Sequence, residues 1–269
     1  MRIVFYVAVA AVSGVVTFGL AWLITRLSMR YRLYPRIRER DVHTRPTPRL
    51  GGVAMFLGMT VAMGVAAVLP AFGLVFDEPS RILGLGAAAL IMVLVGVADD
   101  LWDLDWTVKL AAQILAAGVL AWQGIQLYTL PIGGQTIVSP YVSLIITVFT
   151  VVLVMNAVNF IDGLDGLVAG VAIIAGGVFF VYAYLLQIRA QTEYFNLASL
   201  TTAILIGACA GFWPLNRYPA KLFMGDAGAL LVGLMMAAST ISITGRIDSS
   251  GATGDDPFTA CSAPARIPL

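Results

Sequence analysis

Charged residues are scarce in this 269-residue chain: only 12% of its positions are Asp, Glu, Lys or Arg, against about 25% in an ordinary soluble domain. Because 59% of the residues are hydrophobic, so few charged side chains could not cover a soluble protein's surface. A disordered chain is excluded as well, since such chains are polar and charged. Two cysteines are too few for a disulfide scaffold. The composition therefore predicts an all-α polytopic membrane protein.

The chain contains long apolar runs instead of charged segments. A helix needs about 20 residues to cross about 30 Å of hydrocarbon. We expect eight such helices, at residues 3–25, 50–70, 82–99, 109–124, 141–160, 167–187, 196–213 and 229–244. The first run is too long for the core of a signal peptide and is followed by arginines, which indicates a retained anchor.

Two segments fall outside these runs. Turn residues between β-branched ones predict a short extracytoplasmic hairpin or loop over residues 125–140. Residues 245–269 are rich in Gly, Ser, Thr, Pro and Asp and predict an unstructured tail. We therefore divide the chain into a membrane domain, residues 1–244, and a tail, residues 245–269.

The basic residues predict the orientation. An even number of spans places both termini on one face and gathers four loops on the other, at residues 26–49, 99–109, 161–166 and 214–228. These loops hold most of the 16 Lys and Arg residues, so the positive-inside rule makes them cytoplasmic. Most of the acids lie in the same loops. We therefore expect a multi-pass protein of the inner (plasma) membrane with its active site on the cytoplasmic face.

Asp162 and Asp165 are the only charged residues between Lys109 and Arg189. They lie in the stretch Asn156-Ala-Val-Asn159-Phe-Ile-Asp162-Gly-Leu-Asp165-Gly. Acids at a membrane edge are costly unless they are paired, hydrated or bound to a metal. The polar residues at every third position lie near one face of a helix end, which indicates a binding site. The alternative is a polar helix end, with Asp165 capping the next helix.

Asp99 and Asp100 follow the third span directly. Adjacent aspartates repel each other and are held together more readily by a cation. Lys109, nine residues past Asp100, could balance them or hold a phosphate. The alternative is a solvated acidic loop, which suits Asp103 and Asp105 better.

The fourth loop has one acid, Asp226, between Gly225 and Gly228 at the start of a helix. A helix N-terminus attracts anions, and a carboxylate there can bridge to Mg²⁺. Phe223 could stack on a nucleobase. The alternatives are an N-cap for Asp226 and packing at the membrane interface for Phe223.

The first loop holds eight arginines and the only histidine, His43. A topology signal or contact with anionic lipid headgroups explains most of these arginines. It explains less of the stretch from His43 through Arg49 to Gly52, where Pro and Gly residues fix a defined turn.

Taken together, these stretches resemble the polyprenyl-phosphate N-acetylhexosamine-1-phosphate transferase family (glycosyltransferase family 4). They are His43 to Gly52, Asp99-Asp100 with Lys109, Asn156 to Gly166, and Leu222-Phe-Met-Gly-Asp226-Ala-Gly, in family order. The resemblance implies that a polyprenyl phosphate attacks the β-phosphorus of a UDP-sugar, which gives a lipid pyrophosphoryl sugar and UMP. It also implies Mg²⁺, or Mn²⁺ in its place. Its partners would be the UDP-sugar, the polyprenyl phosphate and the membrane, with no nucleic acid; a homodimer is left open.

The resemblance also implies residue roles. Asp226 would be the main metal ligand, and Asn159 a second ligand or a pyrophosphate contact. Asp99 and Asp100 would handle the incoming lipid phosphate, and Asp162 would lie beside the metal. The remaining substrate contacts would be Asp165 and Phe223 to uracil, Lys109 to phosphate, and Arg49 and His43 in the first loop. Whether an aspartate acts as base or nucleophile stays open; we favour direct attack by the lipid phosphate.

The form Pro46-Thr-Pro-Arg49-Leu-Gly-Gly resembles the undecaprenyl- and decaprenyl-phosphate N-acetylglucosamine-1-phosphate transferases. UDP-N-acetylglucosamine is therefore the expected donor, in the first lipid-linked step of cell-wall or surface-polysaccharide synthesis. Transfer of phospho-N-acetylmuramoyl-pentapeptide is the alternative within the family. Family members continue with further spans and a loop of clustered histidines and arginines, whereas this chain has no histidine after His43. The expectation from that difference is a C-terminally shortened chain with impaired catalysis.

Two rival interpretations come from other classes. An aspartate-rich prenyltransferase would use Asp99, Asp100 and Asp103, but it requires a second such motif and leaves Phe223 to Asp226 unexplained. A cation- or proton-coupled transporter would place its acids near the bilayer midplane and in broken spans. Here the acids gather at one predicted face.

Overall fold

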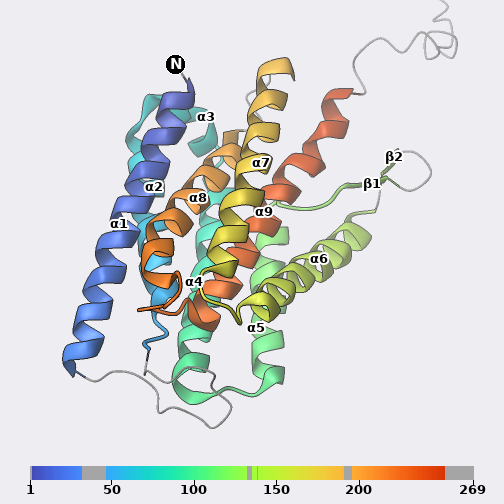
Figure 1. The fold of residues 1–269 in the computed structure, drawn as a ribbon. Helices are drawn as coiled ribbons and strands as arrows, with labels where there is room; N and C mark the ends of the chain where they lie inside the picture. The colour runs from blue at the N-terminus through green and yellow to red at the C-terminus, as the bar shows by residue number, and fades with distance from the viewer. Residues whose placement is uncertain (1, 32–46, 132–134, 138, 191–195, 252–269) are drawn as a thin grey trace, which may run out of the picture.

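The computed structural model describes residues 2–31, 47–131, 135–137, 139–190 and 196–251, and its fold is a bundle of helices (Figure 1). Its elements in chain order are α1 (Arg2–Tyr31), α2 (Gly51–Val68), the 3-10 turn η1 (Pro70–Phe72), α3 (Gly73–Phe76), α4 (Pro79–Trp102), α5 (Trp106–Trp122), β1 (Thr129–Pro131), β2 (Gln135–Ile137), α6 (Pro140–Ile161), α7 (Leu167–Ala190), α8 (Asn196–Asn216) and α9 (Gly225–Gly251).

Seven helices of the described residues are long and apolar enough to cross a membrane, and α5 is a shorter apolar helix. The all-α polytopic class predicted from composition is confirmed, and each of the eight predicted spans corresponds to a helix. The boundaries differ at some ends. Helix α9 begins at Gly225 and continues to Gly251, so residues 245–251 are helical. The rest of the predicted tail lies outside the described residues.

Helix α9 lies at the centre of the bundle. It packs against α2, α4, α6 and α8, and its neighbours bury most of its length, whereas most of α1 and α6 stays exposed. Most exposed residues of α1 and α6 are apolar, as expected for a surface that faces lipid. The functional loops are therefore attached to a buried central helix.

Helix α6 is inclined to its neighbours and leads to the hairpin at one side (Figure 1). Strands β1 and β2 pair antiparallel, with Leu130 opposite Thr136, which confirms the predicted hairpin. The segment between α5 and β1 is hydrogen-bonded to α6: Leu127 N–H donates to the Thr147 hydroxyl (2.9 Å), and the Ser143 hydroxyl donates to the Leu127 carbonyl (2.7 Å).

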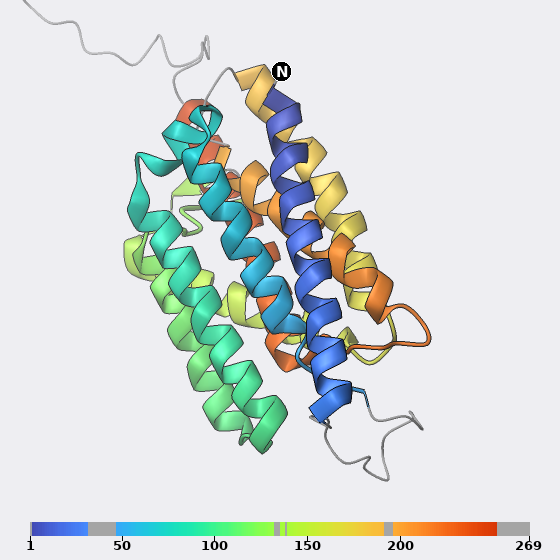
Figure 2. The same ribbon diagram turned by 90° about the vertical axis from the view of Figure 1, so that its left-hand side faces the viewer.

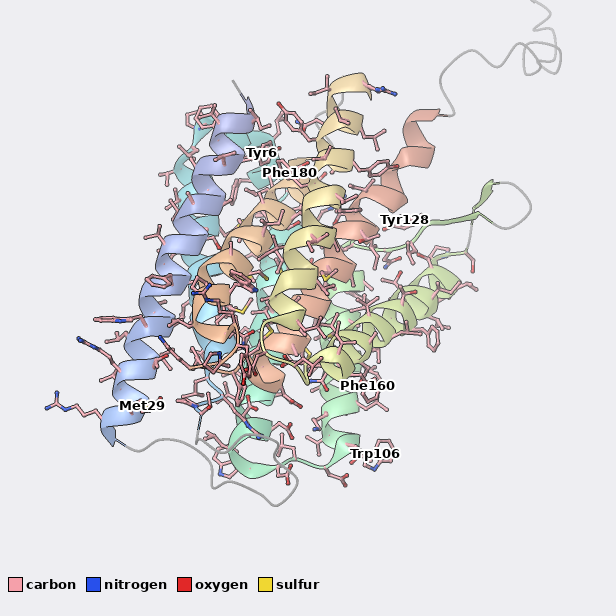
Figure 3. All side chains as sticks on the ribbon, in the orientation of Figure 1. Tyr6, Met29, Trp106, Tyr128, Phe160 and Phe180 are labelled. Atoms are coloured by element: carbon pink, nitrogen blue, oxygen red, sulfur yellow. The ribbon has the colours of Figure 1, made fainter. Side chains whose placement is uncertain are left out.

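The connections that carry the candidate residues lie toward one end of the bundle. The end of α1, the α4–α5 turn, the α6–α7 turn and the α8–α9 loop lie in its lower part in Figures 1 and 2, and the N-terminus lies at the other end. In Figure 3, Met29 and Trp106 mark the lower end, and Tyr6 and Phe180 mark the upper half. The described parts of the four loops that the charge pattern assigned to one face therefore lie toward one end of the structure.

Close helix packing places the start of α9 in this part of the bundle. A Cβ atom on Gly52 would collide with the backbone of Ala227 and Gly228, and one on Gly96 would collide with Ala227. Glycine therefore lets α2 and α4 approach the first turn of α9 more closely than any other residue would allow.

Candidate active site

The site is built around the first turn of α9. Gly225 has a φ of 71°, and a Cβ atom there would collide with the Arg49 carbonyl and the Asp100 carboxylate. Only glycine adopts this backbone without strain. The next residue, Asp226, donates its N–H to Asp100 Oδ1 over 3.3 Å. A carboxylate from α4 thus stabilises the positive N-terminus of α9.

Lys109 joins two of the acids. Its Nζ lies 3.0 Å from Asp99 Oδ2 and 3.4 Å from Asp226 Oδ2. The tight turn between α4 and α5 makes this possible: Asp103 has a φ of 56°, and Leu104 N–H donates to Asp99 Oδ1 (2.8 Å). The turn brings the first turn of α5 back beside the end of α4, so that one ammonium group balances carboxylates from α4 and α9.

The C-terminal end of α6 lies next to Asp226 and contributes two further residues to the site. The Asn159 side chain lies near the Asp226 carboxylate. Asp162 follows at the C-terminal end of α6, where burial, together with the nearby negative charge of Asp226, raises the pKa of its carboxyl group to about 7. Both residues predicted on this helix end therefore meet Asp226.

Backbone hydrogen bonds join the segment before α2 to the segment before α9. Phe223 N–H donates to the Pro48 carbonyl (2.8 Å), Gly51 N–H to the Phe223 carbonyl (3.1 Å) and Gly52 N–H to the Met224 carbonyl (2.9 Å). This short ladder sets Arg49 beside Phe223 and Gly225. Both Arg49 and Phe223 are half-buried.

The α6–α7 turn is fastened to the α8–α9 loop. Asp165 Oδ2 accepts the N–H of Ala220 (3.0 Å). Asn216, which is buried, accepts the N–H of Gly166 (3.1 Å) and donates to the Leu222 carbonyl (3.1 Å). Asp165 and Phe223, the two residues assigned to uracil, thus belong to turns that are linked to each other.

The charges of this region favour a cation. Asp99 and Asp226 contact Lys109, while Asp100 and Asp162 lie near Asp226. One oxygen of Asp100 is buried with no hydrogen-bond partner in the described part of the chain. Carboxylate and amide oxygens are the ligands that Mg²⁺ prefers. The residues therefore fit this ion by charge and chemistry. The described residues contain no group of three or more His, Cys, Asp or Glu side chains already arranged to hold a metal.

Comparison with known proteins decides the family. The model of glycosyl transferase family 4 matches residues 82–244, a range that includes every acid of the site. The chain belongs to glycosyl transferase family 4.

Curated relatives extend the similarity to most of the chain. A decaprenyl-phosphate N-acetylglucosaminephosphotransferase of Mycolicibacterium smegmatis is 36% identical over 255 residues, which are 93% of this chain and 63% of the relative. A probable undecaprenyl-phosphate N-acetylglucosaminyl 1-phosphate transferase of Bacillus subtilis is 28% identical over 83% of this chain and 58% of the relative. A phospho-N-acetylmuramoyl-pentapeptide-transferase of Desulforudis audaxviator is 30% identical over 86% of this chain and 74% of the relative. The chain thus spans less than two thirds of the length of the first two relatives.

The structure brings together most of the residues that the sequence singled out in this family 4 member. Asp99, Asp100, Lys109, Asn159, Asp162 and Asp226 form one group, Arg49 lies beside it, and Asp165 and Phe223 lie on the adjoining turns, whereas His43 lies outside the described residues. Sequence reasoning missed Gln113 and Asn216. A polar residue four positions after Lys109 within an apolar span was the available signal for Gln113.

Proposed function

We propose that this family 4 chain transfers N-acetylglucosamine 1-phosphate from UDP-N-acetylglucosamine to a membrane polyprenyl phosphate. The products are a polyprenyl-pyrophosphoryl sugar and UMP. The observation that carries the proposal is the contact of Lys109 with Asp99 and Asp226 at one end of an apolar bundle. A polyanionic, water-soluble donor and a lipid acceptor can meet at such a place.

The proposed reaction is a phosphoryl transfer. An oxygen of the lipid phosphate attacks the β-phosphorus of the donor, and the bond from that phosphorus to the oxygen bridging it to the α-phosphorus breaks. The electron pair leaves with UMP. Such a reaction depends on positioning and charge neutralisation more than on covalent chemistry. Lys109 would bind phosphate oxygens, and Asn159 would orient the Asp226 carboxylate.

Asp226, Asp100 and Asn159 are the residues that would hold Mg²⁺. When bound, the ion would neutralise charge on the pyrophosphate. Lys109 balances part of the acidic charge of the group. The buried oxygen of Asp100 has no hydrogen-bond partner in the described chain, so it would be available as a metal ligand. Mn²⁺ also takes oxygen ligands, so it would serve as an alternative to Mg²⁺ at this site.

The donor would approach from the cytoplasm, where UDP-sugars are made, so we place the site on the cytoplasmic face of the plasma membrane. The positive-inside rule, applied to the basic residues of the sequence, supports this orientation. Phe223 and Arg49 lie beside the charged group, where the nucleotide would bind, and Asp165 lies on the turn linked to the Phe223 loop. Two of the relatives described above are named for N-acetylglucosamine transfer, which supports this sugar over the muramoyl pentapeptide.

The test is release of UMP by the purified chain in detergent with Mg²⁺ and a polyprenyl phosphate. We expect UMP from UDP-N-acetylglucosamine and much less from UDP-N-acetylmuramoyl-pentapeptide. The reverse preference would overturn the donor, and no UMP from either would overturn the activity. Uptake of labelled substrate into proteoliposomes without UMP release would instead support a transporter.

A further inference from the structure

Gln113 is a polar residue inside the apolar helix α5, and only 3% of it is exposed. Its side chain pairs with that of Asn156 on α6. Asn156 Nδ2 donates to Gln113 Oε1 over 2.6 Å, and Gln113 Nε2 donates to Asn156 Oδ1 over 3.4 Å. Asn156 also donates to the Val152 carbonyl of its own helix (2.8 Å). The two amides thus exchange hydrogen bonds across the α5–α6 interface.

This pair lies one helical turn from the charged group on both helices. Gln113 follows Lys109 by four residues, and Asn156 precedes Asn159 by three, so each amide shares a helix face with a residue of the site. Lys109 contacts Asp226, and Asn159 lies near the carboxylate of the same residue. The amide pair therefore joins α5 and α6 one turn away from the residues of each helix that lie next to Asp226.

The amide pair is one of the contacts that place helix α6. The helix packs mainly on α9 and α5, and most of its surface is exposed, including Phe149 (67%) and Leu153 (53%). Apolar contacts with lipid are equally good at any rotation of a helix about its axis. A reciprocal amide pair is sensitive to rotation, because a rotation or a shift by one residue breaks both hydrogen bonds between the amides and leaves the buried Gln113 amide unpaired in an apolar environment.

We propose that Gln113 is a positioning residue. Through Asn156, it sets the rotation of α6 so that Asn159 and Asp162 face Asp226. Gln113 itself touches neither the charged group nor a substrate in this account. The catalytic part of this inference rests on the proposed transferase activity, and its geometric part does not.

Three variants separate positioning from simple stabilisation: Gln113→Leu, Asn156→Leu and the double variant. Each single change removes both hydrogen bonds between the two amides, and Asn156→Leu also leaves the buried Gln113 amide without its partner, so both thermal stability and kcat should fall. The double change replaces both partners by apolar groups, which is nearly neutral for stability. We expect the double variant to regain its melting temperature in detergent while kcat stays about 10- to 100-fold low and KM for the donor changes little. Recovery of kcat together with stability would overturn the proposal.

A matched control is the hydroxyl pair of Thr201 and Ser239, whose oxygens lie 3.0 Å apart between α8 and α9. This pair is also buried and also joins two helices. The double change Thr201→Val and Ser239→Ala should leave kcat unchanged. An equal loss of kcat in this control would mean that any buried interhelical pair has the same effect, which would contradict a specific role for Gln113.

A second measurement needs no activity. Nitroxide labels at the exposed positions Leu115 on α5 and Phe149 on α6 report the distance between the helices by electron paramagnetic resonance, in a chain with Cys209 and Cys261 replaced by alanine. We expect a broader or shifted distance distribution with Gln113→Leu and with the double Leu variant. An unchanged distribution would overturn the proposal. If the unaltered chain released no UMP, the proposed function would fail, and this distance would still decide the positioning role.

Discussion

The ammonium group of Lys109 lies 3.4 Å from the carboxylate of Asp226, although 117 positions separate the two residues in the chain. The same group lies 3.0 Å from Asp99. One lysine thus joins acids from α4 and α9, and we propose it as the residue that binds a phosphate oxygen of the substrate.

Lys109→Met should therefore impair the reaction severely. The change removes the only cation bound to Asp99 and Asp226 in the described structure. Loss of one such preorganised group typically lowers kcat by about 100- to 1,000-fold. The chain's other lysine, Lys221, is exposed on the α8–α9 loop, so Lys221→Met is the matched control and should keep normal UMP release. Equal rates for the two variants would remove Lys109 from the mechanism.

Asp226→Asn should abolish Mg²⁺-dependent turnover while membrane insertion stays normal. The substitution keeps the shape of the side chain but removes the negative charge that a metal and Lys109 require. Asp105→Asn, at an exposed position in the α4–α5 turn, tests whether loss of any nearby acid has the same effect and should be harmless. UMP release at rising Mg²⁺ concentration measures both variants, and near-normal release by Asp226→Asn would exclude it as the metal ligand.

Asp165→Ala should raise KM for the UDP-sugar more than it lowers kcat. Asp165 accepts the N–H of Ala220 in the loop that leads to Phe223, and we propose that it contacts the uracil rather than the reacting phosphorus. Loss of a contact that binds substrate and transition state equally well appears chiefly in KM. Asp165→Asn keeps an acceptor oxygen and should have the smaller effect. A pure kcat defect in Asp165→Ala would instead place this residue in the chemical step.

Gly52→Ala should destabilise the fold by about 1–3 kcal/mol. Its added methyl group would meet the backbone of Ala227 and Gly228, which cannot move aside as a flexible side chain can. Gly64 lies in the same helix with nothing near its Cβ position, so Gly64→Ala should be neutral or stabilising. Thermal unfolding in detergent compares the two, and equal melting temperatures would contradict the close approach of α2 and α9.

The helices and their common functional end were predictable from the sequence for physical reasons. Lipid requires long apolar helices, so eight apolar runs marked them, and the few acids stood out against that background. Asp99, Asp162 and Asp226 were singled out in this way, and the structure places them close to one another.

Other features leave no such mark in a sequence. The ladder between Pro48 and Phe223 uses backbone atoms, which every residue has. The inclination of α6 follows from packing with distant segments. The role of Gln113 could not be predicted from its own position, because its partner Asn156 lies 43 positions away and only the fold brings the two amides together.

The central claim is transfer of a sugar phosphate to a lipid, and the fate of the β-phosphate tests it most directly. The purified chain would be incubated with Mg²⁺, a polyprenyl phosphate and UDP-N-acetylglucosamine that carries ³²P in the β-phosphate. We expect the label to move into the organic phase as lipid pyrophosphoryl sugar and unlabelled UMP to appear in equal amount, and we expect a metal chelator to stop both. Label that stays entirely in the aqueous phase would contradict the claim.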